Sequence, residues 1–214
     1  MRKRITIHWG RVAIFIAAVL LIIAGLAFFL SRCFPFSREQ TDKAPHYVKK
    51  LYLKKNPYSR PADALTEVND IVIHYVGNPG TSAEANRNYF NNLSSRRSNP
   101  EGTKASAHFI VGLSGEIIQC IPLTEIAYAN YPRNEDTVSI EVCHPDEGGQ
   151  FAPETYQSLV RLTADLLNEY GLTAEHVIRH YDVSGKACPK YYVENEDAWN
   201  RLKADIAAKT EEGK

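Results

Sequence analysis

The sequence has no excess of charge of either sign, because 25 lysines and arginines balance 25 aspartates and glutamates. A protein that binds nucleic acid needs a basic field, so the net charge of +0 argues against nucleic acid as a partner. Four cysteines in 214 residues are too few for a disulfide scaffold. The chain also contains no internal repeat and no low-complexity tract, which leaves an ordinary globular domain as the expected organisation.

One long uncharged apolar run stands near the amino end. Residues 12–30 would span about 28 Å as a helix, which is enough to cross a bilayer core. The preceding tail, residues 1–11, is basic, so we expect it in the cytoplasm and the rest of the chain outside the cell membrane. A cleaved signal peptide is the alternative, but the apolar run continues past the small residues at 25–27 and favours a single-pass anchor.

The remainder of the chain divides into a short stalk, one domain and a tail. Residues 31–44 are polar and of mixed charge, which is typical of a stalk, and residues 210–214 form the tail. Between them, residues 45–209 are long enough for one domain with a single core. The part from 45 to 60 is too aromatic for a free linker, so we expect it to pack on the domain and border its groove.

The apolar pattern predicts a mixed α/β fold. Strands are expected at 70–76, 108–113, 116–121 and 137–143, with the middle two joined as a hairpin by Ser114-Gly115. Helices are expected at 82–93, 153–170 and about 195–209, with Ser82 as a cap and Gly171 as a stop. Cys120 and Cys143 fall on predicted neighbouring strands, where they could form a disulfide or stay as buried thiols.

The segment 177–189 carries the most informative chemistry. His180 and Cys188 stand on either side of a tight Asp-Val-Ser-Gly loop, in which Gly185 permits the reversal. An imidazole and a thiolate are two of the three protein ligands that a catalytic zinc takes, with the fourth position left for water. Lys186 can reach the same space, although most loop lysines are simply solvated. The pair becomes meaningful only with a third ligand and a base.

The third ligand is expected at His74, inside the apolar strand 70–76. A lone core histidine usually does no more than bond a carbonyl, but beside a His/Cys loop the ligand interpretation is favoured. The base is expected at Glu141, which shares one face of the strand 137–143 with Ser139. Partial burial would raise its pKa and suit it to proton transfer, and a solvated sheet face is the alternative. His144 is a weaker candidate for a substrate contact.

Four stretches of the chain together resemble the zinc-dependent N-acetylmuramoyl-L-alanine amidases, which share their fold with phage amidase lysozymes and peptidoglycan recognition proteins. They are residues 71–77, 106–111, 139–145 and 177–189, in the family's order, within a resemblance that covers roughly 45–209. The resemblance implies a single mixed β-sheet flanked by helices. It also implies a zinc held by His74, His180 and Cys188, with Lys186 matching the catalytic lysine and Glu141 the general base of one branch.

Two departures from the family are visible. Ala107 stands where the phage-type enzymes carry a tyrosine, so its share of proton transfer would pass to Glu141 or be absent. The loop 127–131 lacks the histidine that some relatives carry there. Zinc would activate water and polarise a carbonyl, Glu141 would move the proton to the departing amine, and Lys186 would offset the charge on the carbonyl oxygen.

We therefore expect a monomeric, membrane-anchored zinc amidase that acts outside the cell on peptidoglycan, at the bond between N-acetylmuramic acid and L-alanine. Two alternatives remain. One is a peptidoglycan-binding module without activity, which the presence of the third ligand, Cys188, disfavours. The other is a cysteine hydrolase with Cys188 as nucleophile and His180 or His108 as base.

Overall fold

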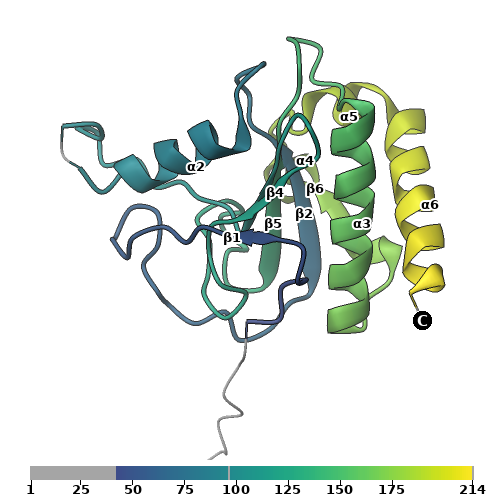
Figure 1. Ribbon diagram of the computed structural model, residues 1–214, viewed down its shortest axis with the longest axis horizontal. Coiled ribbons are helices and arrows are strands. Elements are labelled where there is room, and N and C mark those ends of the chain that lie inside the picture. Colours follow the sequence, from purple (N-terminus) through teal and green to yellow (C-terminus); the bar gives the residue numbers. More distant parts are fainter. Residues whose placement is uncertain (1–41, 96, 214) are drawn as a thin grey trace, which may run out of the picture. The chain divides into compact units, whose positions relative to one another are not determined.

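The computed structural model describes residues 42–95 and 97–213, which belong to one unit of the chain (Figure 1). The predicted tail 1–11, the predicted anchor 12–30 and most of the predicted stalk lie outside the described residues. Among the residues that are described, no helix is both long and apolar enough to cross a membrane.

A mixed six-stranded sheet forms the centre of this unit, in the order β1-β4-β3-β5-β2-β6. Neighbouring strands run parallel except for the β3–β4 hairpin. The longest pairing joins β2 to β5, in register from Asp70 opposite Thr137 to Tyr75 opposite Val142. The strands are β1 (Lys49–Lys50), β2 (Asp70–Tyr75), β3 (Phe109–Val111), β4 (Ile117–Gln119), β5 (Thr137–Val142) and β6 (Val177–Arg179).

Helices cover the sheet on both sides, so the expected α/β fold with one mixed sheet flanked by helices is confirmed. The long helices α3 and α6 lie side by side against one face, and α2 lies on the other side (Figure 1). The helices are α2 (Ala83–Asn92), α3 (Pro153–Tyr170), α4 (His180–Ser184), α5 (Lys190–Glu194) and α6 (Glu196–Glu212), with a 3-10 turn at Ala174–His176.

Strand alternation divides the core in two. On β5, Val138, Ile140 and Val142 pack into the cluster that includes the buried residues of α3 and α6. Cys143 belongs to a second cluster on the α2 side, together with Phe90. The predicted division of this strand into two faces is therefore confirmed, and Glu141 lies on the face away from α3 and α6.

The predicted ends of the helices agree with the structure at two caps. The Ser82 hydroxyl accepts a hydrogen bond from the Ala85 amide and begins α2. Gly171 ends α3 with φ +67°, a left-handed conformation that glycine adopts without steric cost. The last helix is longer than predicted, because α6 continues to Glu212 and buries Thr210, within the predicted tail 210–214.

The amino-terminal part of the domain packs on the sheet, as predicted for residues 45–60. Leu51 and Leu53 donate backbone hydrogen bonds to the carbonyls of Gln119 and Cys120, and Leu53 is buried. Contacts with the domain begin before the predicted boundary at residue 45. Asp42 already belongs to the domain, because its carboxylate accepts hydrogen bonds from the Gln119 amide (2.8 Å) and the Leu123 backbone (3.1 Å).

Two predicted turns differ from the structure. The β3–β4 connection has a three-residue loop rather than two, since Gly112 N donates to Glu116 O and Gly115, at φ +82°, forms the bulge. The segment between His180 and Cys188 is not a plain loop. It contains the short helix α4, which Gly185 ends with φ +75°, and the Tyr181 amide donates to the Cys188 carbonyl at 2.9 Å.

Cys120 and Cys143 are free buried thiols. They were predicted on neighbouring strands, but β3 lies between β4 and β5. Two strand spacings amount to about 9.6 Å, beyond the Cα separation of about 7 Å that a disulfide can bridge. They also pair at opposite ends of β3, Cys120 with His108 and Cys143 with Val111.

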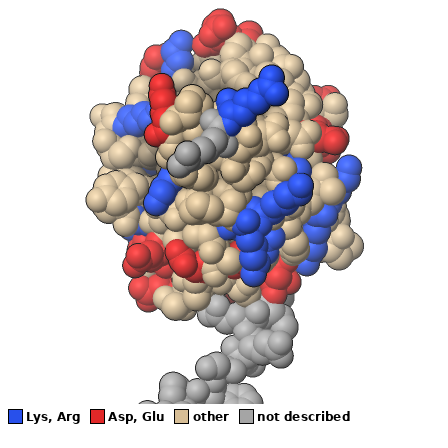
Figure 2. All heavy atoms as spheres, turned by 90° about the vertical axis from the view of Figure 1, so that its left-hand side faces the viewer, with Lys and Arg blue, Asp and Glu red and all other residues tan. Residues whose placement is uncertain are grey.

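The surface on the α2 side carries charges of both signs. Figure 2 shows acidic and basic side chains at several places around this face, with uncharged surface between them. The balanced composition of the chain is thus reflected in a mixed distribution of charge on this face.

Candidate metal centre and active site

His74 lies near the carboxyl end of the central strand β2, between β5 and β6. Its neighbours Ile71 and Ile73 belong to the core against α3 and α6, so its side chain points to the opposite face. Glu141 stands directly beside it in the register and therefore points the same way. The His74 Nδ1 atom is 4.0 Å from Glu141 Oε1 and 3.7 Å from Cys188 Sγ.

His180 and Cys188 come to the same place from the chain that follows β6. The rings of His180 and His74 have centroids 4.5 Å apart, and the Nδ1 atom of His180 is buried without a hydrogen-bond partner. One donor atom from each of His74, His180 and Cys188 lies within 4.8 Å of the other two. The structure thus brings together all three residues that the sequence singled out as ligands.

The donor set suits a zinc ion. Two imidazole nitrogens and one sulfur are ligands that zinc prefers, with three protein ligands at a catalytic centre. A nitrogen and a sulfur bound to one tetrahedral zinc are about 3.6 Å apart, given the usual bond lengths. The separation of 3.7 Å between His74 Nδ1 and Cys188 Sγ is close to that value. These residues could therefore hold zinc with little rearrangement.

A chain of buried hydrogen bonds sets the tautomer of His74. The Thr137 hydroxyl donates to the Arg133 carbonyl (2.6 Å), so it accepts from Asn130 Nδ2 (2.8 Å). The Asn130 carbonyl oxygen must then face His74, and it lies 2.7 Å from Nε2. His74 therefore carries its proton on Nε2 and presents the Nδ1 lone pair to Cys188 and Glu141, as a metal ligand requires.

Asn130 is the residue that the sequence interpretation missed. The loop 127–131 was noted only for lacking a histidine, yet it supplies the hydrogen-bond partner of His74. A polar amide in the apolar setting of Ala127 and Ala129 was the available signal. Asn130 is 1 % exposed, and a buried amide needs a partner.

Burial keeps both histidines in the neutral form that binds metals. It lowers the pKa of His74 to about 3, with a contribution from the nearby His180, and it also lowers the pKa of His180. Burial raises the pKa of the Cys188 thiol to about 12, so the thiolate needs a neighbouring cation to form.

Glu141 lies beside the three proposed ligands His74, His180 and Cys188, called the ligand group below, and is largely buried. Its side chain is 17 % exposed, and its Oε2 atom is buried without a hydrogen-bond partner. Burial raises its pKa to about 8, against an opposing effect of the Lys186 charge. A carboxyl that exchanges its proton near neutral pH can serve as a general acid and base.

Lys186 lies exposed on the connection between α4 and Cys188. Its charge lowers the pKa of His74, His180 and Glu141, which places the ammonium within electrostatic reach of the group. No hydrogen bond or ion pair of the described residues joins its ammonium to them. The lysine can thus approach a ligand that binds above the site.

The other two histidines singled out in the sequence are held elsewhere. His108, the alternative base, bonds the Glu125 carbonyl through Nε2 (3.0 Å) and accepts from the Ser139 amide through Nδ1 (3.1 Å). His144 bonds the Asp146 carbonyl (2.7 Å) and stacks on Tyr75, whose ring packs against the α3–α6 core. Ala107, at the place of the family's tyrosine, is fully buried.

A cavity of about 690 Å³ opens directly against His180. Asp63 lines it, but none of the residues 45–60, which were predicted to border the groove, is in its lining. Lys104 lies over the ring of Tyr128 at 5.1 Å, and Tyr131 is 82 % exposed. The remaining lining residues are Ile126, Ala129, Pro132, Asn134 and Glu135.

Comparison with known proteins identifies the family of the chain. Residues 64–191 match the family model described as N-acetylmuramoyl-L-alanine amidase. The N-acetylmuramoyl-L-alanine amidase CwlL of Bacillus licheniformis is 35 % identical over 160 residues, which are 68 % of this chain and 42 % of that protein. The chain thus spans less than half the length of this curated relative.

Solved structures show the same fold. The structure of PlyL has a TM-score of 0.62 and 24 % identity, and the match covers 76 % of this chain and 98 % of that one. A mutant endolysin from Bacillus subtilis has a TM-score of 0.61 and 27 % identity, over 74 % of this chain and 97 % of that one. Since the family model matches more than half of the sequence, the chain belongs to the N-acetylmuramoyl-L-alanine amidase family.

Proposed function

We propose that this protein is a zinc-dependent N-acetylmuramoyl-L-alanine amidase that hydrolyses peptidoglycan between N-acetylmuramic acid and the L-alanine of the stem peptide. The observation that carries the proposal is the convergence of His74, His180 and Cys188 donors within 4.8 Å. Membership of the family and the printed names of the relatives support the choice of substrate.

His74 Nδ1, His180 Nδ1 and Cys188 Sγ would hold the zinc. When bound, zinc polarises the carbonyl of the scissile amide and lowers the pKa of water, which is the chemistry that amide hydrolysis at neutral pH needs. The buried and unpartnered Nδ1 of His180 supports this assignment, because a buried polar atom without a partner costs free energy unless a ligand engages it.

Glu141 moves the proton. Its carboxylate takes a proton from the attacking water and delivers it to the nitrogen of the departing L-alanine. The amide and one water thereby become a carboxylate on the lactyl side and a protonated amine on the peptide side, because the second proton of the water also ends on that nitrogen. Its position beside His74, and a pKa that burial raises to about 8, support both halves of this role.

Lys186 acts on the carbonyl oxygen. Negative charge builds on that oxygen as water adds to the carbon, and an aimed cationic donor in such a site contributes roughly 3–4 kcal/mol. Lys186 is exposed and within electrostatic reach of the ligand group, so its ammonium can meet a substrate that lies against His180. The cavity of about 690 Å³ at His180 gives that substrate a place.

The two alternative functions have less support. A nucleophilic cysteine needs a lowered pKa, whereas burial raises that of Cys188 to about 12, and His108 has both ring nitrogens engaged elsewhere. A peptidoglycan-binding module without activity would not need a complete ligand group beside a buried carboxyl.

The location of the protein remains a proposal that rests on the sequence. Residues 12–30 would anchor the chain in the cell membrane with its amino end in the cytoplasm. The domain would then face the wall outside the cell, acting as a monomer.

One experiment tests the function directly. Purified wall is incubated with the protein, and the released fragments are identified by mass spectrometry while the metal content of the same sample is measured. We expect free stem peptides that begin with L-alanine, about one zinc per chain, and loss of activity with a chelator. Cleavage at a glycosidic bond, or full activity without metal, would contradict the proposal.

A further inference from the structure

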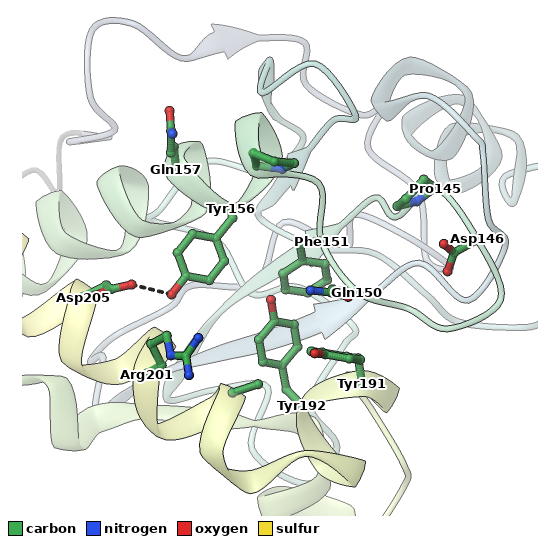
Figure 3. Close-up of a pocket in the computed structure, with 12 residues that line it drawn as sticks. Pro145, Asp146, Gln150, Phe151, Tyr156, Gln157, Tyr191, Tyr192, Arg201 and Asp205 are labelled. Carbon is green, nitrogen blue, oxygen red and sulfur yellow. Dashed lines mark hydrogen bonds between the residues drawn. The ribbon is translucent and has the colours of Figure 1, made fainter.

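A second cavity, of about 480 Å³, lies where α3, α5 and α6 meet the segment 145–153 (Figure 3). The three proposed metal ligands, Glu141 and Lys186 are all absent from its lining. Its walls come instead from the side of the sheet that carries the long helices. The cavity is therefore separate from the groove at His180.

Aromatic side chains form much of this cavity. Phe151 and Tyr192 are buried with ring centroids 4.7 Å apart, and Tyr191 packs edge-on against Tyr192 at 5.2 Å. Tyr156 lines the opposite side and is partly exposed. Rigid aromatic faces of this kind accept the flat apolar face of a sugar ring or of a peptide side chain.

Arg201 brings a positive charge into the same space. Figure 3 shows its guanidinium directed between Tyr156 and Tyr192. Two acidic residues also line the cavity, but both are engaged: Asp205 accepts from the Tyr156 hydroxyl (2.6 Å) and Asp146 from the Gly148 amide (2.9 Å). No salt bridge within the described part of the chain involves Arg201. Both carboxylates keep their charge because their donors are neutral, and Arg201 is the one cationic side chain in the lining.

We propose that this cavity is a second peptidoglycan-binding site, which holds a carboxylate-bearing unit of the polymer while another unit occupies the active site. The proposal rests on the proposed function. The planar guanidinium of Arg201 would bind the carboxylate through two hydrogen bonds. The tyrosine rings would hold the neighbouring sugar or peptide, and Gln150 and Gln157 supply amides for its polar groups.

Helix α5 joins the two sites. It begins at Lys190, two residues after the proposed ligand Cys188, and it carries Tyr191 and Tyr192. Tyr191 is three positions after Cys188, so their Cα atoms are at most about 11 Å apart. A polymer can therefore contact both sites at once, which strengthens binding to the wall more than binding to a single unit.

Two sources of carboxylate share this chemistry. Uncut stem peptides carry carboxylates, and hydrolysis of the muramic acid amide leaves a new lactyl carboxylate on the glycan. Stem-bearing wall and stem-free glycan strands used as separate probes distinguish them. Binding that depends on Arg201 only with stem-bearing wall identifies the stem peptide as the ligand, and such binding with stem-free glycan identifies the lactyl carboxylate.

The test compares Arg201→Gln and Arg201→Glu in the full-length chain, with Glu141→Gln added so that binding is measured without cutting. We expect Arg201→Gln to weaken cosedimentation with purified wall about tenfold, and Arg201→Glu to weaken it further. Lys203→Gln is the matched control, because it removes the same charge from the same helix outside the cavity lining. It should bind like its parent. Thermal unfolding of each variant checks that the fold is retained.

Activity gives a second measurement. With Glu141 intact, both Arg201 variants should cut a single disaccharide–peptide unit at the parent rate but cut whole wall more slowly. Unchanged wall binding in both variants, an equal loss in Lys203→Gln, or tighter binding in Arg201→Glu would overturn the second site. If the parent cuts neither substrate, the proposed function fails, while binding that depends on Arg201 is still measurable.

Discussion

His74 and His108 are two buried histidines of the same sheet with different surroundings. Each is 2 % exposed or less, and burial lowers the pKa of both. Both ring nitrogens of His108 are bonded within the protein, to Glu125 and Ser139. The Nε2 atom of His74 bonds Asn130, whereas its Nδ1 atom has only the sulfur of Cys188 at 3.7 Å and the Glu141 carboxylate at 4.0 Å, which are the other groups of the proposed centre.

Burial alone therefore does not distinguish a functional histidine from a structural one in this fold. What separates the two is the hydrogen-bond inventory, because a saturated imidazole has nothing left to offer a ligand. Three groups around His74 extend the contrast: Glu141 Oε2 and His180 Nδ1 are buried without partners, and Cys188 Sγ faces the ring. The groups around His74 can therefore bind a metal ion, whereas the hydrogen bonds of His108 connect parts of the fold.

Removing the sulfur of Cys188 has the largest expected effect on metal binding and activity in the His74 region. We expect Cys188→Ser to lose both the zinc and the activity, because a hydroxyl is a poor replacement for a thiolate ligand. Metal analysis and release of wall fragments measure the two effects. Cys143→Ala, at a buried cysteine that is outside the ligand group, is the control and should keep its zinc. Full zinc occupancy in Cys188→Ser would remove Cys188 from the ligand set.

Changing the carboxyl separates metal binding from chemistry. Glu141→Gln should retain zinc while the turnover number falls about 10²- to 10⁴-fold, the usual contribution of a general acid–base. The rate of wall cleavage and the metal content are measured on the same preparation. Near-normal turnover would show that another group moves the proton.

Acid tests the His108 region. An unfolded imidazole takes up its proton near pH 6.5, whereas burial keeps the pKa of folded His108 at about 4. Acidification through this window stabilises the unfolded state, so His108 should lower the free energy of unfolding by about 3 kcal/mol between pH 6.5 and 4. Urea unfolding of the metal-free Cys188→Ser chain, with and without His108→Gln, isolates this effect. Parallel pH curves for the two chains would contradict it.

The smallest expected effect comes from changing Asn130, the partner of His74 Nε2. Asn130→Ala removes the acceptor that fixes its tautomer, so zinc affinity should weaken about 10- to 100-fold, or about 1.4–2.7 kcal/mol. Competition with a chelator of known affinity measures this change. Ser139→Ala removes a hydroxyl beside His108 instead and should leave the zinc affinity unchanged. An equal loss in both variants would mean that Asn130 acts only through general stability.

Local sequence patterns were enough to predict most of the elements that carry the site. Alternation along 137–142 placed Glu141 on the face opposite to Val138, Ile140 and Val142. The apolar run at 71–73 predicted that the strand of His74 lies in the interior of the sheet. Ser82 and Gly171 marked helix ends because cap chemistry depends on neighbouring residues alone. The short helix α4 was not predicted, since five residues are too few to show a helical period.

Hydrogen bonds between residues far apart in the sequence could not be predicted from local patterns. Asn130 is 56 positions from His74 in the chain, and only the folded sheet brings the amide to the ring. The cavity at Arg201 likewise needs α3, α5 and α6 together with the segment 145–153. The strand order that separates Cys120 from Cys143 could not be predicted either. Strands β4 and β5 follow one another in the sequence, but β3 lies between them in the sheet.

The residues of the proposed centre could be selected from the sequence alone, because ligand and base chemistry belongs to the side chains. They are His74, His180 and Cys188, with Glu141 and Lys186. The tertiary structure decided which histidine nitrogens remain available, through the partners Asn130, Glu125 and Ser139. The physical reason is that a side chain brings its donors and acceptors with it, while their satisfaction depends on atoms that only folding brings within about 3 Å.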